Sequence, residues 1–248
     1  MSTPFSEIHF NRNAVRPIEC LKAGMELVKS QYWLFLGIIA VGMIIASMVP
    51  LGIMLGPMMC GIYVALFKQR RGQLIEFGDL FKGFDYFKDS LIASLLHVIP
   101  VFVIIIPTYV IFYISLIAMI GASGGQPDPA VVLGFFGFWA LIFVVVVVVM
   151  VLISVIFTFA YPLIVDRRLS GMDAVKLSAK AAMANYMGLI GLMLLTSLLG
   201  IIGAMFCYVG AFLIAPVTFA ALGTAYEQVF GLSDVQPNIP PPPPPSFV

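Results

Sequence analysis

The sequence predicts an all-α, polytopic integral membrane protein. Its six transmembrane helices are expected to form three hairpins, each preceded by an amphipathic interfacial helix. Of the 248 residues, 61% are hydrophobic and only 10% are charged, whereas about 25% of a soluble domain is charged. Four long stretches contain no Asp, Glu, Lys or Arg: 30–67, 90–127, 129–165 and 181–226. Such stretches are typical of membrane spans and exclude a soluble enzyme, a nucleic-acid-binding protein and a disordered chain.

The span boundaries follow from the thickness of the bilayer. A hydrocarbon core of about 30 Å takes about 20 helical residues. Residues 131–165 are longer than this, yet no Gly, Pro, Asn or Asp interrupts 138–161, which favours one over-long tilted helix over two short ones. Turn residues divide the other long stretches. Six spans are therefore expected, at 32–49, 51–67, 91–120, 131–165 and, on either side of a turn at 203–210, within 186–226.

The positive charges predict the orientation. All 13 lysines and arginines lie in three segments, 12–29, 68–88 and 167–180, whereas the turns near 50, 121–130 and 203–210 have none. With six spans these three segments share one side of the membrane, which the positive-inside rule assigns to the cytoplasm. Both termini are then cytoplasmic, and a seventh span is disfavoured because it would place the last cluster outside.

The cytoplasmic segments resemble one another, which predicts a threefold repeat. Each contains an acid, two apolar residues and a lysine, as in Glu19–Lys22, Asp79–Lys82 and Asp173–Lys176, and a span begins about ten residues later. Apolar residues at helical spacing accompany them, as expected for helices in the headgroup plane. The predicted units are 17–72, 73–171 and 172–231, with a cytoplasmic tail at 1–16 and a proline-rich cytoplasmic tail at 232–248.

Several short motifs carry a family resemblance: Gly56-Pro57 with Gly61, Arg71-Gly72, the segment 79–84, and the stretch 160–166. Through them the chain resembles bacterial multispan inner-membrane proteins of the domain-of-unknown-function type, and it is similar to the membrane domain attached to some glycerophosphodiester phosphodiesterases. The resemblance covers roughly residues 15–231. It implies six helices in a bacterial inner membrane and no assigned chemistry.

Two sets of residues are candidates for a site. The arginine pairs Arg70/Arg71 and Arg167/Arg168 stand at equivalent helix exits and could bind lipid phosphate groups, although they could equally serve only to set orientation. His97 is the one ionisable group within a predicted span, and such groups are functional candidates. A structural role is favoured for His97 because no acid within the membrane could form a proton relay with it.

Catalytic, cofactor and metal sites are not predicted. Residues 121–125 match GxSxG, but they lie in an external loop with no base in reach. Cys20, Cys60 and Cys207 are far apart and form no metal-ligand motif. We therefore expect three reduced thiols and no enzyme activity.

The favoured function is a non-catalytic membrane module that acts through lipid or protein contacts, with membrane lipids as partners and no nucleic acid. The alternative is a permease or lipid-handling transporter with a cavity between the hairpins, and a midplane pocket lined by His97, Thr108 and Tyr109 would favour it. The six consecutive prolines at 240–245 predict a polyproline II segment that could bind a protein partner.

Overall fold

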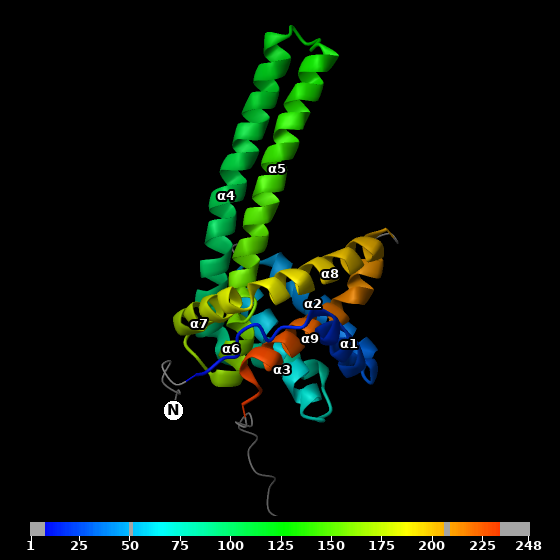
Figure 1. The fold of residues 1–248 in the computed structure, drawn as a ribbon, viewed down its shortest axis with the longest axis vertical. Helices are drawn as coiled ribbons and strands as arrows, with labels where there is room; N and C mark the ends of the chain where they lie inside the picture. Colours follow the sequence, from blue (N-terminus) through cyan, green and yellow to red (C-terminus); the bar gives the residue numbers. More distant parts are fainter. Residues whose placement is uncertain (1–7, 50–51, 206–208, 234–248) are drawn as a thin grey trace, which may run out of the picture.

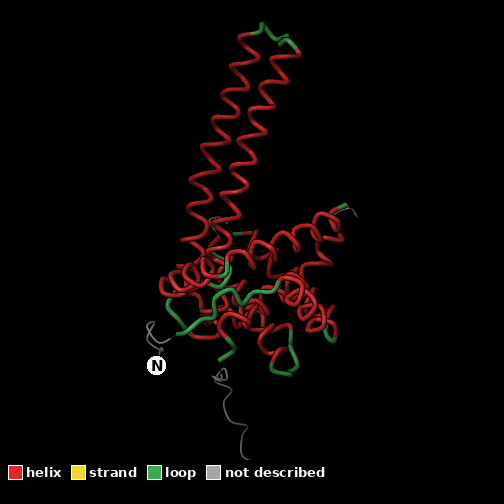
Figure 2. The backbone as a smooth tube through the Cα atoms, in the orientation of Figure 1, coloured by secondary structure: helices red, strands yellow, loops and turns green. Residues whose placement is uncertain are grey.

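The residues that the computed structural model describes, 8–49, 52–205 and 209–233, fold into helices joined by short loops, and they contain no β-strand (Figure 2). The predicted all-α class is therefore confirmed. In chain order the elements are α1 (Pro17–Lys29), α2 (Tyr32–Met48), α3 (Leu55–Arg70), the 3₁₀ helix η3 (Phe77–Tyr86), α4 (Phe87–Ala122), α5 (Pro129–Phe157), α6 (Ala160–Arg167), α7 (Gly171–Ala184), α8 (Tyr186–Ala204) and α9 (Val209–Phe230).

Several helix starts follow directly from local sequence. α2 begins at Tyr32 and α8 at Tyr186, as predicted. Ser170 caps α7 by accepting a hydrogen bond from the Asp173 amide, with an N–O distance of 3.3 Å. Asp128 caps α5 in the same way, because its carboxylate accepts a bond of 2.7 Å from the Ala130 amide.

The second amphipathic segment differs from a regular α-helix. Residues 77–86 form η3, which begins with a reciprocal capping box between Glu76 and Asp79. Gly78 and Gly83 lower its α-helical propensity, and Gly83 packs against α3 with no room for a side chain. The backbone of this 3₁₀ segment lies in direct contact with the backbone of α3.

The fourth predicted span is one long helical stretch, Pro129–Arg167, with a short irregularity inside it. It consists of α5 and α6, which are separated by a break at residues 158–159. The side chain of Ser178 from α7 stands in this break: it donates to the Ile156 carbonyl at 2.6 Å and accepts from the Phe159 amide at 3.1 Å. A side chain inserted into the helical ladder is a recognised cause of such breaks. Pro162 contributes as well, because it has no amide to bond the Thr158 carbonyl four residues earlier and its ring crowds that carbonyl.

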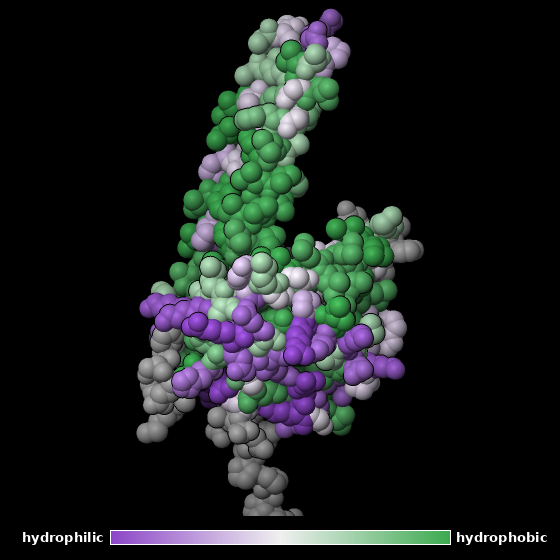
Figure 3. All heavy atoms as spheres, viewed as in Figure 1, coloured by the Kyte–Doolittle hydropathy of each residue, from purple (hydrophilic) through white to green (hydrophobic). Residues whose placement is uncertain are grey.

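The helices form a body from which one long pair projects (Figure 1). The 36 residues of α4 make a rod of about 54 Å, and α5 lies beside it along most of this length. Almost none of the most apolar stretch of either helix is buried. The surface of the pair is accordingly hydrophobic, whereas hydrophilic residues gather over the body (Figure 3).

Four segments of the described chain are long and apolar enough to cross a membrane: Phe77–Ala122, Pro129–Arg167, Tyr186–Ala204 and Gly210–Phe230. The number of candidate spans rises to five if α1 and α2, which are bent by 103° relative to each other, are counted together as one broken span. The α3 helix is shorter, because only Leu55–Phe67, about 20 Å, precedes its first lysine. Most of α3 is buried among the other helices of the body.

The contact between α3 and η3 is the closest in the body. A Cβ atom added to Gly61 of α3 would lie 1.9 Å from the backbone oxygen of Leu80 in η3. Leu80 itself is fully buried. Only glycine allows this approach, so the two elements pack backbone against backbone.

We therefore expect Gly61→Ala to lower the stability of the protein by about 1–3 kcal/mol, the usual cost of overpacking. Thermal unfolding in detergent would measure it. Gly134→Ala in α5 is the control, because nothing lies within 4 Å of its added methyl group, and alanine favours a helix by about 1 kcal/mol over glycine. A Gly61 variant as stable as the Gly134 variant would contradict this close contact.

Candidate functional site

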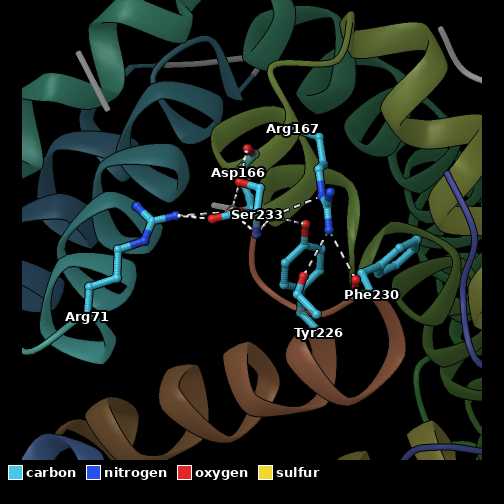
Figure 4. A network of polar contacts seen from close by, with 7 residues as sticks. Arg71, Asp166, Arg167, Tyr226, Phe230 and Ser233 are labelled. Carbon is cyan, nitrogen blue, oxygen red and sulfur yellow. Dashed lines mark hydrogen bonds and ion pairs between the residues drawn. The ribbon is translucent and has the colours of Figure 1, made fainter. Parts of the chain in front are cut away.

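A buried carboxylate, Asp166, marks the point where the ends of α3, α6 and α9 meet (Figure 4). Asp166 is the penultimate residue of α6 and its side chain has no exposed surface. Arg71 reaches it from the end of α3, Tyr226 from the last turns of α9, and Ser233 from the segment that follows α9.

Hydrogen bonds and ion pairs surround both oxygens of this carboxylate. Ser233 Oγ lies 2.7 Å from Oδ1, and Arg71 Nη2 lies 3.3 Å from it. The Tyr226 hydroxyl donates to Oδ2 at 2.8 Å, and the Ser233 amide lies 3.2 Å from both oxygens. Arg71 Nη2 also donates to the Ser233 carbonyl at 3.2 Å. The buried negative charge is therefore fully paired.

The neighbouring Arg167 caps the C-terminal end of α9. Its Nη2 donates to the carbonyls of Phe230 and Gly231 at 3.1 and 3.2 Å. These groups lie at a helix C-terminus, where carbonyls lack partners within the helix. Its Nε lies 3.2 Å from Asp166 Oδ2, close enough for an ion pair but not aligned for a hydrogen bond.

The local backbone explains how these side chains converge. Each of the three helices ends with a residue in the left-handed region: Gly72 at φ 72°, Arg168 at φ 51° and Gly231 at φ 66°. Arg71 and Arg167 each stand immediately before such a residue. Beyond Gly231, the reversal of the chain carries Ser233 back to Asp166.

This arrangement holds the ends of three helices together, and the chain itself occupies the hydrogen-bonding positions of the carboxylate. A general base must have a free position for a substrate proton, whereas both oxygens of Asp166 are occupied by the chain itself. Among the described residues, no group of three or more His, Cys, Asp and Glu could hold a metal ion. The cysteines Cys20 and Cys60 are buried and free, and Cys207 lies outside the described residues.

The four predicted lipid-contact arginines occupy different surroundings. Arg71 and Arg167 are partly buried and meet at Asp166. Arg70 is more exposed, and its Nε pairs with Glu227 Oε2 of α9 at 2.7 Å. Arg168 is exposed and hydrogen-bonds the Tyr86 side chain. Their guanidinium groups thus contact the chain itself, a use that the sequence did not indicate.

The other predicted site residue, His97, lies against the break between α5 and α6. Its ring stacks on Phe157, with centroids 4.6 Å apart and planes 8° from parallel. Its Nδ1 atom is buried, and no hydrogen-bond partner for it is found in the described part of the chain. Stacking against a phenyl ring is a packing contact.

A groove of about 370 Å³ lies on the α4–α5 pair. Of the three residues expected to line a midplane pocket, Thr108 and Tyr109 line this groove and His97 does not. The Thr108 hydroxyl donates to the Ile104 carbonyl in its own helix. The remaining lining residues are aromatic or aliphatic: Ile105, Phe112, Tyr113, Trp139, Ile142, Phe143 and Val146. The groove therefore belongs to one helix pair.

Sequence reasoning missed two polar anchors of the body. Ser233 was assigned to the proline-rich tail, yet it is buried against Asp166. Asn185, also buried, accepts a bond of 2.7 Å from the Ala14 amide and donates to the Asn11 carbonyl at 2.9 Å. Residues 8–16 of the predicted tail thus pack on the body. For Asn185 the sequence signal is a polar residue between two apolar helices, and for Ser233 no signal distinguishes it from the tail.

The chain was compared with protein-family models, curated proteins and solved structures, and none of them matches it.

The Asp166 contacts predict a large effect for Asp166→Asn. Removing one partner of a buried ion pair costs about 3–5 kcal/mol, because the other charge stays buried without compensation. The melting temperature in detergent should fall accordingly. Glu19→Gln is the matched control, since its exposed pair with Arg16 should contribute about 0–1 kcal/mol. Equal melting temperatures for the two variants would show that Asp166 does not hold the helix ends.

His97→Phe should leave stability nearly unchanged or raise it. Replacing a buried polar group that lacks a partner by an apolar ring of similar shape removes a desolvation cost and keeps the stack on Phe157. His97→Ala should destabilise, because it leaves a cavity. The same unfolding measurement tests both variants, and a loss for Phe as large as for Ala would reveal an unrecognised polar role.

Proposed function

We propose that the chain is a non-catalytic, six-span module of the bacterial inner membrane that acts through lipid or protein contacts. The observation that carries this proposal is the unburied apolar surface of the α4–α5 pair (Figure 3). Soluble monomers rarely expose contiguous apolar patches of more than a few hundred Å², whereas lipid tails solvate such a surface. In this proposal the two helices are two of the six spans.

The other spans follow from the remaining pairs. α8 and α9 supply two, and a backbone contact at Gly203 and Gly210 brings them close together near their turn. α2 and α3 supply the last two as a short pair within the body. The bend of 103° between α1 and α2 supports an interfacial α1, because a helix in the membrane plane must turn about a right angle to enter a span.

The charge distribution supports cytoplasmic termini. Lysines and arginines belong to the body and to its connecting segments, whereas Asp128 is the one charged residue of the 121–130 turn, at the far end of α4 and α5. The positive-inside rule then places the body end in the cytoplasm.

A non-catalytic role is supported by the surroundings of Asp166 and His97, two buried or partly buried side chains that could otherwise act as an acid or a base. Asp166 is saturated by its own chain, and His97 stacks on Phe157 without a nearby acid. A contact through the proline-rich tail remains part of the proposal, although residues 234–248 lie outside the described chain. The anchoring of Ser233 fixes the point on the body from which this tail departs.

The α4–α5 groove is the one observation that favours the alternative, a lipid-handling protein. Its lining is apolar and aromatic, which suits an acyl chain better than a polar solute. The groove lies on one helix pair, however, whereas a transport route is expected between the hairpins.

Cysteine labelling in intact cells tests the six-span arrangement. Gln126→Cys, in the turn between α4 and α5, should react with a membrane-impermeant maleimide from outside. Glu26→Cys, on the exposed face of α1, should react only after the membrane is opened. Reaction of both sites in the same compartment would refute the orientation.

Labelling of the native cysteines should contribute little signal in this experiment. Cys20 and Cys60 are buried, and burial raises the pKa of the Cys20 thiol to about 11, so little of the reactive thiolate forms at neutral pH. Cys207→Ser removes the remaining thiol, and this parent protein should stay unlabelled on both sides.

A further inference from the structure

The α1 helix has a second face that the body does not use. Cys20, Gly24 and Val28 are buried on one side of this helix, where Gly24 packs against the backbone of α9. The opposite side exposes the apolar Ile18 and Met25 next to the cationic Lys22 and Lys29. Apolar and basic residues side by side on a helix are typical of a membrane-surface contact.

The α7 helix repeats this arrangement. Met172 and Lys176 stand in the same positions relative to Asp173 as Ile18 and Lys22 do relative to Glu19. Ile18 and Met172 are 62% and 43% exposed, and Lys176 is exposed as well. Each helix is followed by a tyrosine and then by an exposed apolar residue, Trp33 after α1 and Met187 after α7. The first turns of the two faces are therefore alike, whereas Met25 and Lys29 of α1 correspond to Ala179 and Met183 of α7.

The lysines on these faces differ from most other cations of the body. Arg16, Lys68, Arg70, Arg71, Lys82 and Arg167 all make ion pairs with acidic side chains. Within residues 8–49, 52–205 and 209–233, Lys22, Lys29 and Lys176 make no ion pair. Their charges are free to bind a ligand.

We infer that α1 and α7 form a binding surface for anionic phospholipids of the cytoplasmic leaflet. Lys22, Lys29 and Lys176 bind the lipid phosphates, because a lysine on a flexible stem can reach the headgroup layer while its methylenes follow apolar surface. Ile18, Met25 and Met172 enter the boundary between headgroups and acyl chains. This inference rests on the proposed function, since both helices must lie at the membrane surface.

The surface fits a lipid better than a free phosphate ion. A soluble anion would need only the charges, whereas these faces also expose apolar side chains that water solvates poorly. Two acids of these helices have partners of their own: Glu19 pairs with Arg16, and the Asp173 carboxylate accepts a hydrogen bond from Ser170. Glu26 lies beside the lysines on the outer part of α1 and offsets part of their charge, so the net positive charge of this surface is small.

Lipid retention tests the inference directly. The full chain would be purified in detergent, mixed with phosphatidylglycerol or phosphatidylcholine, and its bound lipids counted by native mass spectrometry. The triple variant Lys22→Gln, Lys29→Gln and Lys176→Gln should retain about tenfold less phosphatidylglycerol, because each lysine near a surface contributes severalfold to anionic-lipid binding. Its weak retention of phosphatidylcholine should not change.

A matched variant separates this surface from net charge. Arg12→Gln, Lys88→Gln and Arg168→Gln together remove the same number of exposed charges elsewhere, and phosphatidylglycerol retention should change less than twofold. An equal loss in both variants, or no loss in the first, would overturn the inference. Added inorganic phosphate should leave the retained phosphatidylglycerol unchanged, and displacement by it would assign the surface to a free anion instead.

Depth measurements provide a test with all three lysines intact. A bimane probe on Met25→Cys should be quenched by lipids that carry a nitroxide near the headgroup, and a probe on Glu26→Cys, one residue along the same helix, should be quenched at least threefold less. Equal quenching at the two positions would overturn the placement of α1. The thiol labelling of residues 26 and 126 reports only on the side of the membrane where each residue lies. If the labelling gives the expected result and the lipid tests fail, the lipid-binding surface is rejected while the proposed six-span arrangement stands.

Discussion

The requirement to neutralise the buried Asp166 carboxylate organises the body of this protein. A charge without exposed surface is tolerated only where ion pairs and hydrogen bonds replace the lost water. Arg71, Tyr226 and Ser233 provide them from three separate parts of the chain. The ends of α3, α6 and α9 are consequently fixed to one another, and residues 8–16 are fixed nearby through Asn185.

This fixed end contrasts with the other end of the molecule. In the body, polar contacts and backbone-to-backbone packing such as that of Gly61 on Leu80 leave little freedom. Along the part of α4 and α5 that projects from the body, the contacts are apolar and join these two helices, with Phe112 and Trp139 in an edge-to-face pair. Specific polar contacts are thus concentrated in the body, and nonspecific apolar surface lies where lipid is proposed to surround it.

Local features of this fold could be predicted from sequence, whereas its long-range features could not. The helix starts at Tyr32 and Tyr186 and the cap at Ser170 depend on neighbouring residues, and apolar composition was enough to identify the long helices. The break at residues 158–159 has a local signal in Pro162, whereas Ser178, which bonds the backbone groups at the break, comes from another helix. The use of Arg71 and Arg167 depends on Asp166, and nothing in the spacing of these residues shows which charges meet. Periodicity also cannot show that α3 is enclosed by the body.

The length of α4 has a consequence for the surrounding bilayer. The uncharged part of α4, residues 91–122, is about 48 Å long and exceeds a hydrocarbon core of about 30 Å, so the pair it forms with α5 must lean steeply or draw the two leaflets apart. Each ångström of such hydrophobic mismatch costs a fraction of a kcal/mol. Thick membrane regions relieve this strain and thin ones increase it, so the protein would partition toward the former.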